Sequence, residues 1–182
     1  NAIPVTLKVL KMRTTSINRE THVTLIEEKG MIVYPKQSVQ MIFPTSTNRI
    51  RTGVLGLDRR AGGGFFKGTT TILAGASGSG KTTFGFQFAA QGVVDGQKSM
   101  FCSLEESPGE IRTMAKSLGI GIDDLEKKGL HLLSWIPENQ SPDAFISTLR
   151  SRIEDLGPSL LVLDGLSTFK HMYSQEMYSI TR

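Results

Sequence analysis

Two hydrophobic patterns divide the chain near residue 46. Apolar and polar residues alternate over residues 5–13 and again over 22–26, and Gly30 precedes the apolar segment MIVYP. Alternation with a period of two is typical of strands with one buried face, and glycine tolerates the positive φ of a tight turn. Residues 1–35 are therefore predicted to form two or three antiparallel strands.

The second pattern alternates strand-like and helix-like segments. Residues 36–46 have no period and are interpreted as a linker. Alternating strands and helices with short connections favour an α/β fold, with a parallel sheet covered by helices. The expected strands are TTTILA (69–74), SMFCSLEE (99–106), LHLLSWI (130–136) and SLLVLD (159–164).

Helix signals lie between these strands. One helix is expected from Lys81 to a stop at Gly92. A second helix follows Ser107, which serves as N-cap while Glu110 completes a capping box. A third is expected over 141–157, capped by Ser141 and ended by Gly-Pro, with its apolar stripe formed by Phe145, Leu149, Ile153 and Leu156.

Composition limits the protein class only coarsely. The 182 residues carry a net charge of +4 and a single cysteine, Cys102. This charge is too mild to predict nucleic-acid binding, and one cysteine excludes an internal disulfide framework. No apolar run approaches the length of a membrane span, so we expect a cytoplasmic protein. His22, His131 and His171 lack metal-ligand spacing, which argues against a transition-metal site.

The segment GASGSGKT matches the phosphate-binding pattern G-x-x-x-x-G-K-[ST]. It lies between an expected strand and an expected helix, which is the context that the motif needs. Its glycines let successive N–H groups point at one phosphate, the lysine can bridge the β- and γ-phosphates, and the threonine hydroxyl can ligate Mg²⁺. The competing interpretation is a flexible Gly/Ser turn. The candidate nucleotide-binding residues are Gly75, Ala76, Ser77, Gly78, Ser79, Gly80, Lys81, Thr82 and Thr83.

Carboxylates at the ends of two expected strands are candidates for the remaining chemistry. Asp164 ends a buried strand, at the edge where open parallel sheets bind ligands, and could orient a metal-bound water. It could instead cap the segment that follows. Glu105 and Glu106 end the strand after the phosphate loop, and one of them could act as general base toward water. Because strand side chains alternate, only one can face the nucleotide directly. Both could also be solvated acids that support a helix N-terminus.

Several separated motifs together resemble the KaiC family of RecA-like P-loop ATPases. The resemblance rests on NRIRTGVLGLDRRAGGGFFKGTTTILAGASGSGKTT (48–83), the paired glutamates before Ser-Pro, AKSLGIGIDDLEKKGLHLL (115–133) and the Asp164 strand. It implies a RecA-like α/β fold over 47–182, continuing beyond Arg182. Residues 1–35 then look like the closing β-hairpin element of a preceding KaiC-like domain, joined by the linker 36–46.

The resemblance also implies a chemistry and an assembly. KaiC-like proteins use ATP and Mg²⁺ and form rings, usually hexamers, with ATP at subunit interfaces. In this family the strand motif K-[ML]-R, here with Lys11 and Arg13, reaches the nucleotide of a neighbouring subunit. Glu105 is the favoured general base, with Glu106 beside it. Gly165 follows Asp164 where many relatives carry serine, which would alter hydrogen bonding around the metal water.

We therefore expect an ATP-hydrolysing, Mg²⁺-dependent module of a ring-forming signalling or clock protein, with self-association and regulatory protein partners. The residues present give no support for autokinase activity. One rival is a RecA/RadA-like DNA-binding recombinase, but the basic residues near the N-terminus lack interleaved aromatics for base stacking. A second rival is a nucleotide-gated assembly scaffold with little turnover. Neither nucleic acid nor membrane is an expected partner.

Overall fold

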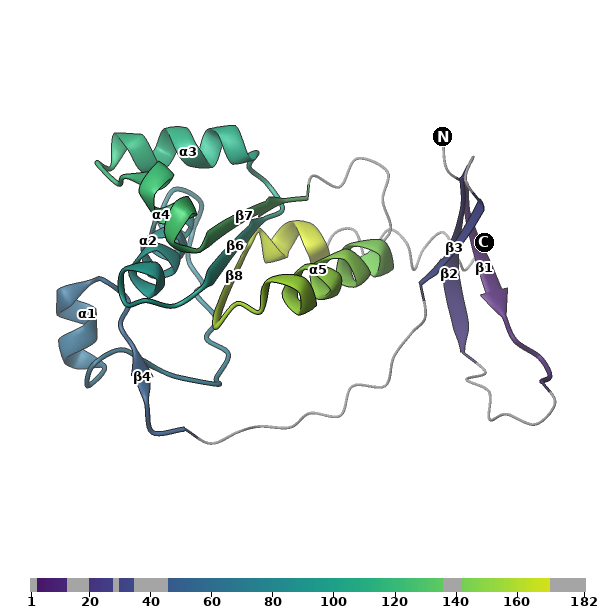
Figure 1. The fold of residues 1–182 in the computed structure, drawn as a ribbon, viewed down its shortest axis with the longest axis horizontal. Helices are drawn as coiled ribbons and strands as arrows, with labels where there is room; N and C mark the ends of the chain where they lie inside the picture. The colour runs from purple at the N-terminus through teal and green to yellow at the C-terminus, as the bar shows by residue number, and fades with distance from the viewer. Residues whose placement is uncertain (1–2, 13–19, 28–29, 35–45, 136–141, 171–182) are drawn as a thin grey trace.

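A three-stranded parallel sheet forms the centre of the fold, as the alternating pattern predicts. β6 (Ser99–Ser103) lies between β7 (Leu130–Ser134) and β8 (Leu160–Asp164) and is parallel to both (Figure 1). The structure, a computed structural model, describes residues 3–12, 20–27, 30–34, 46–135 and 142–170.

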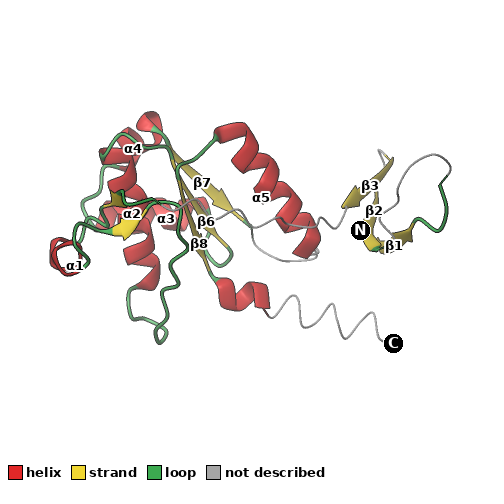
Figure 2. Ribbon diagram, turned by 90° about the horizontal axis from the view of Figure 1, so that it is seen from below, coloured by secondary structure: helices red, strands yellow, loops and turns green. Residues whose placement is uncertain are grey.

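Helices cover both faces of this sheet (Figure 2). One face carries α2 (Lys81–Val94), α3 (Pro108–Ser117) and α4 (Ile122–Lys128). The other carries α5 (Pro142–Leu156) and the helical residues 166–170.

Successive side chains of β6 serve the two sides in turn. Phe101 is fully buried in the core beneath α2, whereas Cys102 is fully buried in the core beneath α5. This alternation fixes which side chains of neighbouring strands face α2, because parallel strands pair in register. The core on the α2 side contains Phe86, Ala89, Ala90, Val93, Phe101, Ile111, Ala115, Ile122, Leu125 and Leu130.

The predicted helices are largely confirmed. α3 follows the capping box: the Glu110 N–H donates to Ser107 Oγ at 3.3 Å, and the Ser107 N–H donates to Glu110 Oε2 at 2.7 Å. Hydrogen bonding of the Glu110 carboxylate to the Ser107 backbone N–H, and then to the Ser107 side chain, holds the pKa of Glu110 below its ordinary value. In α5, Phe145 is buried, while the other three residues of the expected stripe are half-buried. The expected cap of α5, Ser141, lies outside the described residues.

Gly92 does not end α2, contrary to the sequence prediction. The helix continues to Val94, with Gly92 buried inside it. A Cβ on this residue would lie 2.6 Å from Ser99 Oγ and 2.9 Å from Leu160 Cδ2. The glycine therefore permits close packing of the helix on the sheet, which outweighs its low helix propensity.

The strand expected over residues 69–74 is absent, and this prediction is wrong for the described structure. These residues form no ladder, and the side chains of Ile72 and Leu73 are 78% and 50% exposed. A β-rich composition favours a strand only where a partner backbone is available. Within the described part of the chain, β8 pairs with β6 alone, and its Leu161 is 38% exposed rather than covered on both faces.

Short elements before the phosphate loop were not predicted from the pattern. β4 (Arg49–Ile50) pairs antiparallel with β5 (Phe65–Phe66), and α1 (Leu55–Arg60) lies between them.

The carboxylate of Asp58 ties α1 to the residues that precede it. It accepts hydrogen bonds from the backbone N–H and hydroxyl of Thr52, at 2.8 and 2.7 Å, and from the Gly53 N–H at 3.2 Å. The motif T-G-V-x-G-L-D thus has a structural explanation, because its first and last residues bind each other.

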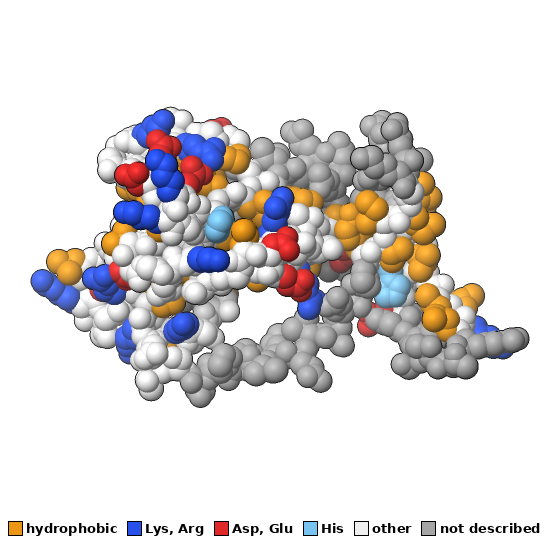
Figure 3. Space-filling view, in the orientation of Figure 1, with side chains coloured by type: hydrophobic (Ala, Val, Ile, Leu, Met, Phe, Trp, Pro, Cys, Tyr) orange, Lys and Arg blue, Asp and Glu red, His pale blue; other side chains and the backbone are white. Residues whose placement is uncertain are grey.

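A separate antiparallel sheet precedes the α/β body, as predicted for residues 1–35. β2 (Thr21–Glu27) is its central strand, between β1 (Ile3–Lys8) and β3 (Gly30–Tyr34). Figure 3 shows hydrophobic side chains gathered on this sheet, in agreement with the exposure of Val5, Ile26, Met31, Ile32 and Val33. The linker prediction falls almost wholly on residues outside the described ranges.

Candidate functional site

The phosphate-binding motif forms an exposed loop that leads directly into α2. Gly78 and Gly80 have φ of 75° and 83°, a left-handed conformation that other residues rarely adopt. Gly80 is the N-cap of α2, so the loop ends where the helix exposes its first N–H groups. A helix start reached through such a loop is suited to bind an anion. Residues 75–80 are all exposed, and the site is therefore open to solvent.

Lys81 folds back over this loop. Its ammonium donates to the carbonyl oxygens of Gly75 and Ala76 at 3.0 and 2.8 Å. The candidate phosphate ligand thus has carbonyl partners that phosphate oxygens could replace. Ser77 and Ser79 are exposed in the same loop. The Thr83 hydroxyl instead points to Met114, with 4.0 Å between Thr83 Oγ1 and Met114 Sδ.

Thr82 and Asp164, far apart in sequence, meet directly. The Thr82 hydroxyl donates to Asp164 Oδ2 at 2.9 Å. Strand alternation explains this contact: Val162 packs in the core beneath α2, and Asp164, two residues on, points the same way. Two oxygen-bearing side chains from the start of α2 and the end of β8 are therefore adjacent, as hard cations require.

The paired glutamates lie on a turn that is held by hydroxyl groups not recognised from the sequence. Buried Ser103 accepts hydrogen bonds from the backbone N–H groups of Glu105, at 3.2 Å, and of Glu106, at 2.9 Å. Ser134, at the end of β7, donates to the Glu106 carbonyl at 2.8 Å. A serine at the last position of a strand is the signal that the sequence offered for such a role.

The two glutamate side chains occupy different environments. Glu105 is exposed, and its Oε1 accepts a hydrogen bond from the Thr168 hydroxyl at 2.8 Å. Glu106 is half-buried, and its Oε2 is shielded without a partner among the described residues. Burial, followed by the negative charges of Asp164, Glu110 and Glu105, raises the pKa of Glu106. Three neighbouring carboxylates therefore disfavour the ionised form of Glu106.

The remaining candidate residues, Lys11 and Arg13, belong to the N-terminal segment 1–35. Lys11 follows β1 and is exposed, and Arg13 lies outside the described residues. Neither is therefore placed at the phosphate loop by the described contacts. In the described part of the chain, no three or more His, Cys, Asp or Glu side chains gather as a metal site, and no helix is long and apolar enough to cross a membrane.

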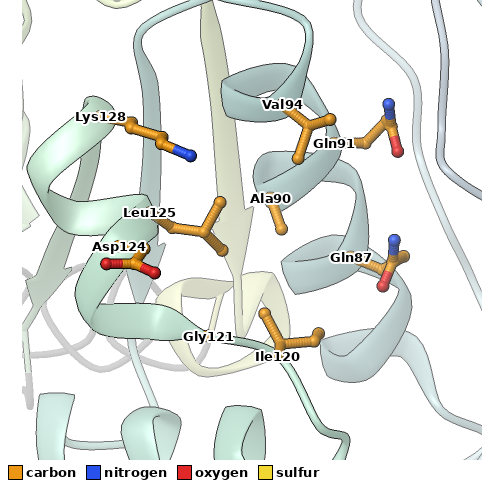
Figure 4. Close-up of a pocket in the computed structure, with 9 residues that line it drawn as sticks. All are labelled: Gln87, Ala90, Gln91, Val94, Ile120, Gly121, Asp124, Leu125 and Lys128. Atoms are coloured by element: carbon orange, nitrogen blue, oxygen red, sulfur yellow. The ribbon is translucent and has the colours of Figure 1, made fainter.

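A hollow of about 330 Å³ lies between α2 and α4, away from the phosphate loop (Figure 4). Ala90, Ile120 and Leu125 form its apolar lining, and Lys128 and Asp124 stand at its polar rim. It lies toward the carboxyl end of α2, whereas the phosphate loop precedes the amino end of that helix. The hollow is therefore separate from the candidate catalytic groups.

Comparisons with known proteins agree with the motif geometry. Residues 50–180 match the family model described as "ATPase: KaiC". A "Circadian clock oscillator protein KaiC" from Picosynechococcus sp. is 32% identical over 163 residues, which is 89% of this chain and 32% of the relative. The protein of the same name from Acaryochloris marina is 30% identical over 174 residues, which is 95% of this chain and 33% of the relative.

The chain spans about a third of the length of these curated relatives. The family match nevertheless covers the phosphate loop, the glutamate turn and Asp164 together. The chain belongs to the KaiC ATPase family.

Proposed function

We propose that this chain binds ATP together with Mg²⁺ and hydrolyses the γ-phosphate. The observation that carries the proposal is the 2.9 Å contact between Thr82 Oγ1 and Asp164 Oδ2. It joins the end of a glycine-rich phosphate loop to the carboxyl end of a parallel strand, next to a turn that bears two glutamates. Such a combination of groups suits phosphoryl transfer, in which positioning and charge stabilisation do most of the work.

The residues present fit a magnesium ion. Thr82 and Asp164 offer a hydroxyl and a carboxylate oxygen, the ligand types that Mg²⁺ prefers. They would hold the ion directly or through its waters. When bound, Mg²⁺ would neutralise negative charge on the phosphates of the nucleotide.

Lys81 and the loop N–H groups account for phosphate binding. To bind ATP, the Lys81 ammonium would leave the carbonyl oxygens of Gly75 and Ala76, at 3.0 and 2.8 Å, for phosphate oxygens. A charge-assisted bond to phosphate is stronger than a bond to a neutral carbonyl, which favours this exchange.

Glu105 is our candidate for the general base. Its side chain is exposed, so water can reach it, whereas one oxygen of Glu106 is shielded. In the proposed step the water oxygen bonds to the γ-phosphorus and the bond from phosphorus to the β,γ-bridging oxygen breaks, with its electron pair leaving on ADP. The water proton passes to the Glu105 carboxylate. Glu106, with its raised pKa, is the alternative base.

Nucleotide binding is tested with Lys81→Ala. We expect ATP affinity to fall about tenfold to 100-fold, as for loss of a charge-assisted hydrogen bond, and ATP-dependent thermal stabilisation to disappear. Lys116→Ala, which changes an exposed lysine in the last turn of α3, is the matched control. Unchanged ATP affinity in Lys81→Ala would reject the phosphate-loop assignment.

Catalysis is tested with Glu105→Gln and Glu106→Gln, which remove charge but keep shape. We expect Glu105→Gln to spare ATP binding and to lower kcat by about 100-fold or more. Glu106→Gln should lower it less. An equal or larger loss of kcat in Glu106→Gln would transfer the role of base to that residue.

We also propose that the protein containing this chain forms rings and acts in signalling or timing. Support comes from the family and from the names of its curated relatives, which are clock oscillator proteins. In such a ring, Lys11 and Arg13 would neutralise charge on the nucleotide of a neighbouring subunit.

Molecular mass by light scattering, with and without ATP, tests ring assembly while phosphate release is measured in parallel. A change of mass without hydrolysis would favour the scaffold alternative. Binding to single-stranded DNA that weakens steeply with salt would favour the recombinase alternative.

A further inference from the structure

The side chain of Glu105 is tied to the turn that follows β8. The Thr168 hydroxyl donates to Glu105 Oε1 at 2.8 Å, while Ser167 Oγ lies 3.5 Å from the same oxygen, at the limit of a hydrogen bond. We propose that Thr168 is a positioning residue for ATP hydrolysis, which fixes the orientation of the Glu105 carboxylate. The inference rests on the proposed function, in which Glu105 accepts the proton of the attacking water.

Gly165 provides the space in which the Glu105 side chain lies. Its φ is +84°, a conformation that favours glycine. A Cβ on Gly165 would lie 3.0 Å from Glu105 Cγ and 3.1 Å from Leu104 Cβ, closer than most side chains tolerate. Glycine at position 165 thus leaves room for the aliphatic part of the Glu105 side chain, while Thr168 donates a hydrogen bond to its carboxylate.

The donor itself is held firmly. The Thr168 N–H donates to the Gly165 carbonyl at 3.0 Å, which closes the first turn of the helical segment 166–170. The next residue, Phe169, packs its ring against Phe145, with 5.6 Å between the ring centroids, in the core beneath α5. Thr168 therefore has a fixed place relative to the sheet.

The acceptor is held as well, because Ser103 binds the backbone N–H of Glu105 at 3.2 Å. Between two fixed backbones, one hydrogen bond can select the side-chain rotamer of an otherwise exposed glutamate. Both hydroxyls point to Oε1, which leaves Oε2 as the oxygen to accept a proton. Catalysis is sensitive to such orientation, since small displacements of a reacting group lower rates strongly.

The test compares Thr168→Val, which removes the hydroxyl and keeps the shape, with Thr168→Ser, which keeps the hydroxyl. In the full chain with ATP and Mg²⁺, we expect Thr168→Val to lower kcat about tenfold and to leave ATP affinity within about twofold. Thr168→Ser should restore kcat to within about threefold of wild type. Ser167→Ala is the matched control, because its longer contact predicts little effect.

A double-mutant cycle distinguishes positioning from a purely structural role. If Thr168 acts through Glu105, adding Thr168→Val to Glu105→Gln causes no further loss of kcat. Additive losses would overturn the inference. An independent readout is the carboxyl ¹³C resonance of Glu105 without nucleotide, which should move in Thr168→Val and stay in Ser167→Ala.

The outcomes separate this inference from the proposed function. If wild type hydrolyses ATP and Glu105→Gln lowers kcat as expected, a normal kcat in Thr168→Val rejects the positioning role of Thr168 and leaves the proposed function in place. Weaker ATP binding at unchanged kcat also rejects it, because that result assigns Thr168 to binding. If the wild-type chain neither binds nor hydrolyses ATP, the proposed function fails and the inference fails with it.

Discussion

Two buried serines at opposite ends of β6 allow one prediction to be made sharply. Ser99 and Ser103 are both fully buried, yet their hydroxyls differ completely in bonding. Ser103 Oγ accepts the N–H groups of Glu105 and Glu106 at 3.2 and 2.9 Å. Ser99 Oγ has no hydrogen-bond partner among the described residues. Replacing each by alanine therefore removes the same atom from the same strand with opposite consequences.

The expected magnitudes follow from this difference. Each hydrogen bond contributes about 0.5–1.5 kcal/mol, so Ser103→Ala should cost about 1–3 kcal/mol. Because Glu105 is exposed, water can replace the lost partner of its backbone N–H, so we expect the loss of stability to lie in the lower half of that range. Ser99→Ala removes a buried hydroxyl that lacks a partner and should leave the free energy of unfolding unchanged or raise it by up to about 1 kcal/mol.

Urea unfolding provides the assay. Trp135 is the single tryptophan, and its backbone N–H donates to the Ser103 carbonyl at 2.9 Å, so its fluorescence reports on this part of the sheet. We expect the unfolding midpoint of Ser103→Ala to fall and the slope with urea to stay constant. If Ser99→Ala loses as much stability as Ser103→Ala, the hydrogen bonds to the glutamate turn are not the cause, and the reasoning is refuted.

Two further predictions concern backbone space and pH. Gly64→Ala places a Cβ 2.0 Å from the Ile50 carbonyl oxygen at φ +111°, so we expect the free energy of unfolding to fall by about 3 kcal/mol or more, measured by thermal unfolding. The control Gly56→Ala in α1, where a Cβ meets nothing within 4 Å, should be neutral or slightly stabilising in the same assay. Burial raises the pKa of the Cys102 thiol from 9.0 to about 12, so its contribution to stability is full below pH 9 and is lost as pH rises toward 12. Between pH 8 and pH 10, the free energy of unfolding of wild type should therefore fall by about 1.4 kcal/mol more than that of Cys102→Ala, measured by urea unfolding. Equal decreases in the two proteins would show that ionisation of the thiol does not contribute to the pH dependence.

Local signals in the sequence were sufficient where one short segment determines the structure. The start of α3 is an example, because Ser107 and Glu110 satisfy each other within a single turn. Asp164 is another, since an apolar run ending in an acid predicts both the strand and the edge where that acid lies. These predictions needed no knowledge of distant residues.

The remaining features depend on contacts between distant segments. Gly92 appears to be a helix stop until its close packing against Leu160 and Ser99 is known. The β-rich residues 69–74 show that composition cannot supply a partner strand. Thr168 and Glu105 are 63 positions apart, and only the fold brings them together. Sequence patterns therefore identified the candidate residues, whereas the hydrogen-bond partners of those residues emerged only from the structure.

The order of the strands has a consequence for local stability. β6 is paired on both sides, whereas β8 is paired on one side among the described strands. Amide hydrogen exchange should therefore be faster in β8 than in β6, because an edge strand can open without unfolding the whole sheet. Such an opening would displace Asp164 and Thr168 together and leave the backbone of Glu105 in place. Brief fraying of one strand could then disable the candidate site reversibly while most of the domain stays folded.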